Sequence, residues 1–475
     1  MVFGGFLEHF DNQIYGGVFE PGSSLADEAG FRMDVLEALK ELKVPVIRWP
    51  GGCFVDAYHW KKGVGPEREP YGDFRWGVIE PNTFGTHEFV ELCRRLDAEP
   101  YICHNGVCDP QENIDWVDYC NAIEGPMAEL RVANGYPNPL NVRYWSVGNE
   151  RHDKPYIHRV RDTARVMKAA NPSVQVMCAG AEVDGSGIPR IPPYLMEQAG
   201  EYLDYVSLHS YSLERGQILA DYDYLTAICR SEQPNQHIEA TIESLKDTGG
   251  ANIQIAYDEW NLRAWQHPGF PRDAVDNYDD PDVRSLVKQR ERENDLAEQY
   301  TMADALFSAS FFNACLRNCE YVTMANIAPL VNTRGPLFVH PEGIVKRTHF
   351  HTMSMYANLL QPQVADSVVT SDMLSGTSVS TIDGIATVDE SGRQWSIALV
   401  NRHPSEHVDC AVNMNTPIPD GAYKAIVLNG DSPDSYNDID HPDRVMPEET
   451  QLVFKKGKAS LAPHSLTIVY VSAEY

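Results

Sequence analysis

Hydrophobic residues in the longer, N-terminal part of the chain follow two periodicities that alternate along the sequence. Short runs rich in β-branched and aromatic residues are typical of buried strands, and the segments between them repeat apolar residues at helical spacing. The strand-like runs are residues 3–6, 44–49, 99–105, 142–147, 174–180, 205–211, 253–260 and 321–327. Eight alternations of strand and helix predict an α/β fold, a (β/α)8 or TIM barrel.

Three of the intervening segments carry a clear helical pattern. They are residues 31–42, 86–96 and 294–316, the last of which is long and apolar on one side. A doubly wound open sheet is the alternative architecture for such an alternation. It requires a glycine-rich phosphate-binding turn after the first strand, and the sequence has none there, so the barrel is favoured.

The pattern changes after about residue 365, where short strands are separated by Gly, Asp, Asn and Pro turns. No helical period of useful length remains, which predicts a C-terminal antiparallel β-sandwich, jelly-roll-like in character. We therefore expect a catalytic barrel over 1–360 and a sandwich over 361–475. The junction, 356–367, is short and partly apolar, so the two parts should pack together. The acidic segment 273–282 is interpreted as a solvated loop on the barrel rim.

Composition narrows the classes of partner. The formal net charge of −29 disfavours nucleic acid and an anionic membrane surface, but leaves neutral molecules such as sugars open. No stretch approaches the ~20 apolar residues of a membrane span, and MVFGGFLEHF lacks the features of a secretion signal. The ten cysteines show no zinc-site spacing, which indicates reduced thiols and a cytoplasmic protein.

Catalytic groups of a barrel lie at the carboxyl ends of its strands. Six of the eight predicted strands present polar or ionisable residues there. These are Glu8, Arg48, Cys53, His104, Asn105, Asn149, Glu150, His209, Tyr211, Asp258, Glu259 and Trp260. The clustering predicts a site at this end of the barrel, although each residue alone is a weak indication.

Glu150 and Glu259 follow the fourth and seventh strands, which face each other across the mouth of an eight-stranded ring. Glycoside hydrolysis needs such a pair, one carboxyl protonated and the other ionised. A separation of ~5 Å favours retention of configuration and ~6.5–9.5 Å favours inversion. The alternative is that both are ordinary rim carboxylates, which the neighbouring Asn149 and Trp260 make less attractive.

Other candidates have both a functional and a structural interpretation. His209 and Tyr211 share one face of their strand and could position the nucleophile or bind a hydroxyl, or simply pack in the core. Arg48 lies deep in a strand and needs a carboxylate partner, which Glu8 or Glu259 could supply. Its expected role is electrostatic support.

Trp260 could form an apolar platform for a sugar ring or pack in the core, and Cys53 is interpreted as a small residue of the pocket wall. The histidines His340, His349 and His351 are close in sequence, but no acidic partner recurs at ligand spacing. No metal and no cofactor are therefore expected.

These motifs resemble glycoside hydrolase family 51, the α-L-arabinofuranosidases, over nearly the whole chain. The resemblance lies in residues 6–22, 46–66, 80–94, 98–102, 144–150, 207–211, 257–261 and 462–469. The combination of Arg-Trp-Pro-Gly-Gly at 48–52 with Gly-Asn-Glu at 148–150 is the specific part. Gly-Asn-Glu alone would indicate only the wider clan of barrel glycosidases.

The resemblance implies a retaining mechanism with Glu150 as acid/base and Glu259 as nucleophile. It also implies that Asn149 holds the sugar 2-hydroxyl and that Glu8 and Arg48 line the subsite; Asn105 is a further expected substrate contact. The implied activity is exo-acting release of terminal α-L-arabinofuranose from oligosaccharides. The family often forms hexamers, so a homo-oligomer is expected.

Several positions depart from the family pattern. Cys53 stands where many members have Asn, and the segments 104–113 and 151–156 differ from the usual loops. The Gln of some members after the eighth strand is not found, and the sandwich is expected to lack one strand. Another glycoside (a β-xyloside, a β-galactofuranoside or a β-glucan) is therefore the alternative substrate, and a catalytically silent carbohydrate-binding protein is a third hypothesis.

Overall fold

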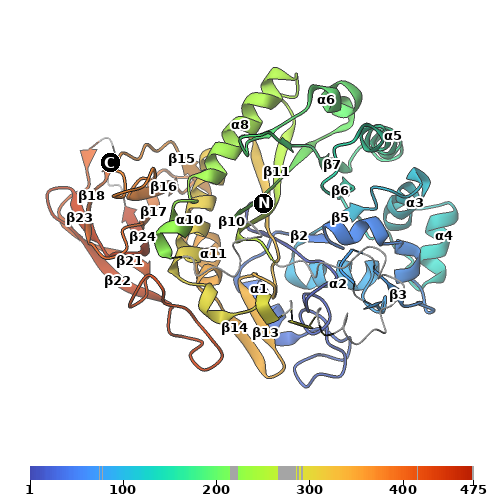
Figure 1. Ribbon diagram of the computed structural model, residues 1–475, viewed down its shortest axis with the longest axis horizontal. Coiled ribbons are helices and arrows are strands. Elements are labelled where there is room, and N and C mark those ends of the chain that lie inside the picture. The colour runs from blue at the N-terminus through green and yellow to red at the C-terminus, as the bar shows by residue number, and fades with distance from the viewer. Residues whose placement is uncertain are drawn as a thin grey trace.

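A closed barrel of eight parallel strands forms the centre of the molecule, in the order β1-β12-β11-β10-β7-β6-β5-β2 (Figure 1). The computed structural model describes residues 1–73, 75–77, 79–213, 223–265, 285, 288–289, 292–414 and 416–472. The barrel strands are β1 (Gly4–Phe6), β2 (Val46–Trp49), β5 (Glu99–His104), β6 (Tyr144–Val147), β7 (Gln175–Ala179), β10 (Tyr205–Leu213), β11 (Gln254–Arg263) and β12 (Val322–Ile327). Each coincides with a predicted strand, so the predicted barrel is confirmed.

Helices cover the outside of the barrel. They are α1 (Met33–Glu41), α2 (Thr86–Leu96), α3 (Pro110–Asn121), α4 (Pro126–Ala133), α5 (Lys154–Ala170), α6 (Pro193–Ala199), α7 (Tyr224–Ile228), α8 (Gln233–Asp247), α10 (Met302–Arg317) and α11 (Thr348–Leu359). The helix predicted over 294–316 begins later, at Met302. Thr301 caps it, accepting from the Ala303 amide and pairing with Asp304 in a capping box, which stops the helix from extending backward.

The barrel interior is apolar at one end and polar at the other. Side chains from all the strands except β1 fill the amino-terminal half, namely Val46, Tyr101, Tyr144, Met177, Tyr205, Ala256 and Met324. The long connections after the strands build the opposite mouth. They include the 3-10 turns η1 (Cys53–Ala57) and η2 (Trp60–Gly63) and the hairpins β3–β4 (Tyr71–Gly72, Ile79–Glu80), β8–β9 (Glu182–Val183, Pro189–Arg190) and β13–β14 (Leu337–His340, Gly343–Lys346).

The C-terminal part is an antiparallel β-sandwich, as predicted. One sheet has the order β15 (Gln363–Ala365), β16 (Ile382–Val388), β17 (Gln394–Asn401), β24 (Ser465–Ser472), β21 (Gly421–Leu428) and β22 (Pro447–Phe454). The pair β18 (Val408–Ala411) and β23 (Lys458–Leu461) and the hairpin β19–β20 (Asn413–Met414, Thr416–Pro417) complete it. Ile397 and Leu399 of the large sheet share a core with Ala459 and Leu461 of β23.

The sandwich packs against α10 and α11 on the outside of the barrel (Figure 1). Asn313 of α10 donates to Asp383 at 2.9 Å, and Arg402 donates to Ser310 at 2.9 Å. Ile385 of the sandwich belongs to the same apolar core as the barrel. Segment 273–282 lies outside the described residues. Within the described ranges, no helix has the length and apolar character required to cross a membrane.

Candidate active site

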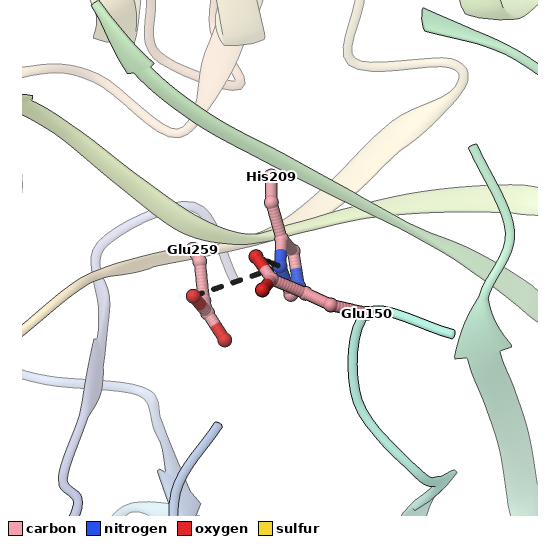
Figure 2. Close-up of side chains that lie close together, drawn as sticks. All are labelled: Glu150, His209 and Glu259. Atoms are coloured by element: carbon pink, nitrogen blue, oxygen red, sulfur yellow. Dashed lines mark hydrogen bonds and ion pairs between the residues drawn. The ribbon is translucent and has the colours of Figure 1, made fainter. Parts of the chain in front are cut away.

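Polar side chains from four strands and the loops after them meet at the carboxyl-terminal mouth of the barrel. Arg48 lies on β2, Asn149 and Glu150 follow β6, His209 and Tyr211 lie on β10, and Glu259 lies on β11. In Figure 2 the side chains of Glu150, His209 and Glu259 point toward one another. The predicted convergence of strand ends is therefore observed for these residues.

Arg48 holds the centre of the site. Its Nη1 donates to Glu259 Oε1 at 2.5 Å, and its Nη2 donates to Asn149 Oδ1 at 2.7 Å. Its Nε lies 3.4 Å from Asp258 Oδ2. The guanidinium is buried, so it is a fixed positive charge between two carboxylates. Of the two partners expected from the sequence, Glu259 is the one it contacts.

Glu259 is held at both oxygens. Oε1 accepts from Arg48, and Oε2 accepts from the Tyr211 hydroxyl at 2.6 Å. His209 Nδ1 lies 3.6 Å from the same Oε2. A buried carboxylate with a cationic donor on one oxygen and a hydroxyl on the other has a fixed orientation. A fixed orientation suits a nucleophile.

Glu150 sits on a sharp turn at the end of β6. Its own φ is +43° and that of Gly148 is +74°, both in the left-handed region. A Cβ at Gly148 would lie 2.8 Å from Tyr156 Cε2 and 2.9 Å from Gly106 Cα, so only glycine fits. The turn aims Glu150 across the mouth, where its Oε1 meets His209 Nδ1 at 3.0 Å. Its side chain is 41% exposed, unlike that of Glu259.

One ligand atom each from Glu150, His209 and Glu259 lies within 4.8 Å of the others. Such spacing would admit a cation, but Arg48 and His209 already supply positive charge to these carboxylates. Burial opposes the charge on His209, yet Glu259, Asp258 and Glu150 outweigh burial and raise its pKa to about 10. The cluster therefore has the character of an acid–base site with its own counter-ions.

Asp258 lies beneath the mouth of the barrel and contacts His209 on the side away from Glu150. It accepts from the Tyr101 hydroxyl at 2.6 Å and from Ser207, and its Oδ1 lies 3.3 Å from His209 Nε2. Burial would raise its pKa, but Arg48 and His209 outweigh burial and lower it to about 2. The β10–β11 register shifts between Ser207 and His209, so consecutive residues of β11 both face this network. Sequence reasoning missed this role, because strand alternation alone does not foresee a bulge.

Glu8 follows β1 and lies near Glu259. Its Oε1 accepts from the amides of Gly52 (2.9 Å) and Phe54 (2.8 Å) and from Trp76 Nε1 (3.0 Å). Its Oε2 has no hydrogen-bond partner among the described residues. Burial raises the pKa of Glu8 to about 8, and Glu259 adds to the effect. The carboxyl is therefore largely protonated at neutral pH and can offer a hydrogen bond to a ligand.

Cys53 and a set of aromatic rings form the walls. Asn149 Nδ2 lies 3.9 Å from Cys53 Sγ. Burial, with Glu150, raises the pKa of this thiol, so it stays protonated and suits a pocket wall rather than a nucleophile. Trp76 stacks on Phe10 at 4.0 Å, and Trp265 packs edge-on against Tyr211 at 4.8 Å. Trp76 was not predicted, because it comes from the long connection after β2.

Two predicted substrate contacts are contradicted by their placement. Trp260 stacks on Phe311 of α10, with ring centroids 3.7 Å apart, because it points outward from the strand whose Glu259 points inward. The side-chain amide of Asn105 forms hydrogen bonds with backbone groups. Its Nδ2 donates to the carbonyls of residues 56 and 58, and its Oδ1 accepts from the amides of residues 107 and 108, so it holds the loops together.

A parallel eight-stranded barrel with two carboxylates at its mouth, one bound by a buried arginine, is the arrangement that barrel glycoside hydrolases use. Two family models match the chain. The α-L-arabinofuranosidase 1 domain covers residues 38–227, and the α-L-arabinofuranosidase C-terminal domain covers residues 258–465. With the relatives described next, these matches show that the chain belongs to glycoside hydrolase family 51, the α-L-arabinofuranosidases.

Named relatives and solved structures agree. α-L-Arabinofuranosidase C of Emericella nidulans is 31% identical over 91% of this chain and 87% of its own length. An intracellular exo-α-(1→5)-L-arabinofuranosidase of Acetivibrio thermocellus is 30% identical over 86% of this chain and 83% of its own. The arabinose complex of a Thermotoga maritima α-L-arabinofuranosidase has a TM-score of 0.84 at 26% identity, over 99% of this chain and 96% of that one. The protein is thus a glycoside hydrolase.

Proposed function

We propose that this enzyme is a retaining exo-α-L-arabinofuranosidase that releases terminal α-L-arabinofuranosyl residues from arabino-oligosaccharides. The observation that carries the mechanism is the approach of Glu150 and Glu259 oxygens to within 4.8 Å. That separation suits direct attack by one carboxylate, and it leaves less space than the ~6.5–9.5 Å that an inverting enzyme needs for a water molecule. The names of the family 51 relatives support the sugar.

In the first step Glu259 attacks C1 of the sugar while Glu150 gives a proton to the departing oxygen. Arg48 and Tyr211 fix the orientation of the attacking carboxylate, so little reorganisation is needed before attack. The bond from C1 to the leaving oxygen breaks as the ester to Glu259 forms. The aglycone departs as a neutral alcohol.

In the second step water replaces the enzyme at C1. Glu150, now a carboxylate, takes a proton from water as the water oxygen attacks C1, and the ester to Glu259 breaks. The exposure of the Glu150 side chain, against the burial of Glu259, supports this division of roles. The acid/base must meet both leaving group and water, whereas the nucleophile needs only the sugar.

The rest of the pocket offers groups for the sugar hydroxyls. Asn149 is the residue that the family resemblance assigns to the 2-hydroxyl. Oε2 of Glu8, which has no hydrogen-bond partner among the described residues, is the second polar atom that we propose for a sugar hydroxyl. Cys53 adds a weakly polar wall beside Asn149. We propose a cytoplasmic location, supported by ten free thiols and by the relative named intracellular.

The experiment is hydrolysis of p-nitrophenyl α-L-arabinofuranoside by the wild type, Glu259→Ala and the surface control Glu91→Ala. We expect the nucleophile variant to lose several orders of magnitude in kcat and the control to match the wild type. The corresponding β-D-xyloside and β-D-galactofuranoside are run beside it. Preference for either of those would replace the sugar assignment, and full activity of Glu259→Ala would remove the proposed mechanism.

A further inference from the structure

The imidazole of His209 is surrounded by hydrogen-bond acceptors at both ring nitrogens. Nδ1 lies 3.0 Å from Glu150 Oε1 and 3.6 Å from Glu259 Oε2. Nε2 lies 2.9 Å from Ser207 Oγ and 3.3 Å from Asp258 Oδ1. Because Ser207 donates its own hydrogen to Asp258, the Ser207 oxygen is left to accept from the ring.

This geometry fits a doubly protonated ring. A neutral imidazole carries a lone pair on one nitrogen, and here that lone pair would face a carboxylate whichever nitrogen carried it. An imidazolium donates at both positions and places its charge among three carboxylates, two of which also contact Arg48. Its raised pKa follows from the same surroundings. His152, in the same loop as Glu150, also interacts electrostatically with His209, which lowers the pKa of His152 further after burial.

We propose that His209 stores the catalytic proton of the resting enzyme and passes it to Glu150, and that Asp258 is the positioning residue that keeps this proton on the ring. The inference rests on the proposed retaining mechanism and goes beyond it. It gives the acid a source for its proton besides the water that reaches its partly exposed side chain. It also gives a role in the reaction to Asp258, which is buried behind His209 and does not reach the sugar.

The proton balance closes over one turnover. In the proposed resting state His209 carries a proton on each ring nitrogen, and the proton that Glu150 will use is the one on Nδ1. When a glycoside displaces water from Glu150, the Nδ1–H bond breaks, the electron pair stays on Nδ1, and the proton moves to the Glu150 oxygen. Glu150 then protonates the leaving oxygen as Glu259 forms the ester. In the second step the proton that Glu150 takes from water returns to Nδ1, which restores the resting state.

The resting state is tested without substrate, by NMR of the full-length protein carrying ¹⁵N-labelled histidine, with His209→Asn to assign the signal. We expect both His209 nitrogens to be protonated at pH 8. In Asp258→Asn the titration midpoint of His209 should fall by about one pH unit or more, because the imidazolium loses the carboxylate beside Nε2. A fall of one unit corresponds to a loss of about 1.4 kcal/mol of interaction. Ser207→Ala, a milder change, should shift it the same way if Asp258→Asn does not fold. A neutral His209 at pH 8 in the wild type would overturn the proposal.

Transfer to Glu150 is tested by leaving-group dependence. His209→Asn should lower kcat/KM on phenyl α-L-arabinofuranoside by ~10²–10⁴, the range of a lost general acid. Turnover of the 2,4-dinitrophenyl glycoside, which leaves without a proton, should fall far less. The control His441→Asn removes an exposed histidine that pairs with Asp438, and it should change neither. Equal losses on both substrates would mean that His209 acts only in packing. An inactive wild type would reject the proposed sugar, whereas the NMR result would stand.

Discussion

Removing the guanidinium of Arg48 should destabilise the fold far more than removing an exposed arginine. Arg48→Met keeps the apolar stem against the rings of Phe6 and Tyr101. It deletes the donors to Glu259 at 2.5 Å and Asn149 at 2.7 Å and the charge 3.4 Å from Asp258. Two buried carboxylates then lose the closer of their two cationic neighbours and keep only His209, which lies 3.3 Å from Asp258 and 3.6 Å from Glu259.

The expected loss is ~3–5 kcal/mol of unfolding free energy at pH 7, the usual cost of breaking a buried ion pair by removing one partner. The loss should depend on pH with a definite sign. The pKa of Asp258 is about 2 in the folded wild type, below its ordinary value of 3.8, so its stabilising effect is present above pH 3.8 and is lost as the pH falls through about 2. In Arg48→Met the Asp258 carboxyl should take up its proton at a higher pH than in the wild type, so the variant lacks this stabilisation. The difference in unfolding free energy between wild type and variant should therefore shrink below about pH 4.

The assay is urea unfolding followed by tryptophan fluorescence at pH 7 and pH 3.5. Arg94→Met is the matched control, because Arg94 is 73% exposed and pairs with Glu91 on the surface of α2. That change should stay within ~0.5 kcal/mol of the wild type. If Arg48→Met is no less stable than Arg94→Met at pH 7, the reasoning about buried charge is refuted. A difference that is equal at both pH values would refute the part assigned to Asp258.

Three further predictions follow from the pocket and the family. Glu8→Gln should gain thermal stability relative to the wild type as the pH rises from 4.5 toward 8. The pKa of Glu8 is raised in the folded state, so the wild-type fold loses stability over that pH range, whereas the Gln variant does not. An equal dependence of Tm on pH in the two proteins would contradict this. Cys53→Asn should lower KM for the aryl arabinofuranoside ~2–10-fold by adding one hydrogen bond, and a higher KM would show that Cys53 does not face the sugar. The expected hexamer should elute in light-scattering chromatography with six times the mass of the single chain, and a monomer would contradict it.

The barrel could be predicted because its strands are buried on both faces. Such strands are largely apolar runs, for example 142–147 and 174–180, and their alternation with helices leaves few topologies. The start of α10 could not be placed as well, because the apolar pattern continues from 294 through the capping residue Thr301. There the hydrogen bonds of the cap, and not hydrophobicity, decide where the helix begins.

At the site, strand ends identified the residues that converge but not their partners. Glu259, Arg48 and Tyr211 meet as expected, whereas Trp260 packs on α10 because neighbouring residues of a strand point to opposite faces. Asp258, although it directly precedes Glu259, faces the same network because of the register shift beside His209. The residue pattern of the strand did not predict that shift. Long-range contacts such as Trp76 with Glu8 depend on how a loop returns over the barrel.

The measurement that tests the central claim most directly is the stereochemistry of transfer. The enzyme is given p-nitrophenyl α-L-arabinofuranoside in dilute methanol, and the first methyl glycoside formed is examined by ¹H NMR, since that product does not mutarotate. Two displacements at C1, by Glu259 and then by methanol, predict methyl α-L-arabinofuranoside. Methyl β-L-arabinofuranoside as the first product would contradict the covalent role of Glu259.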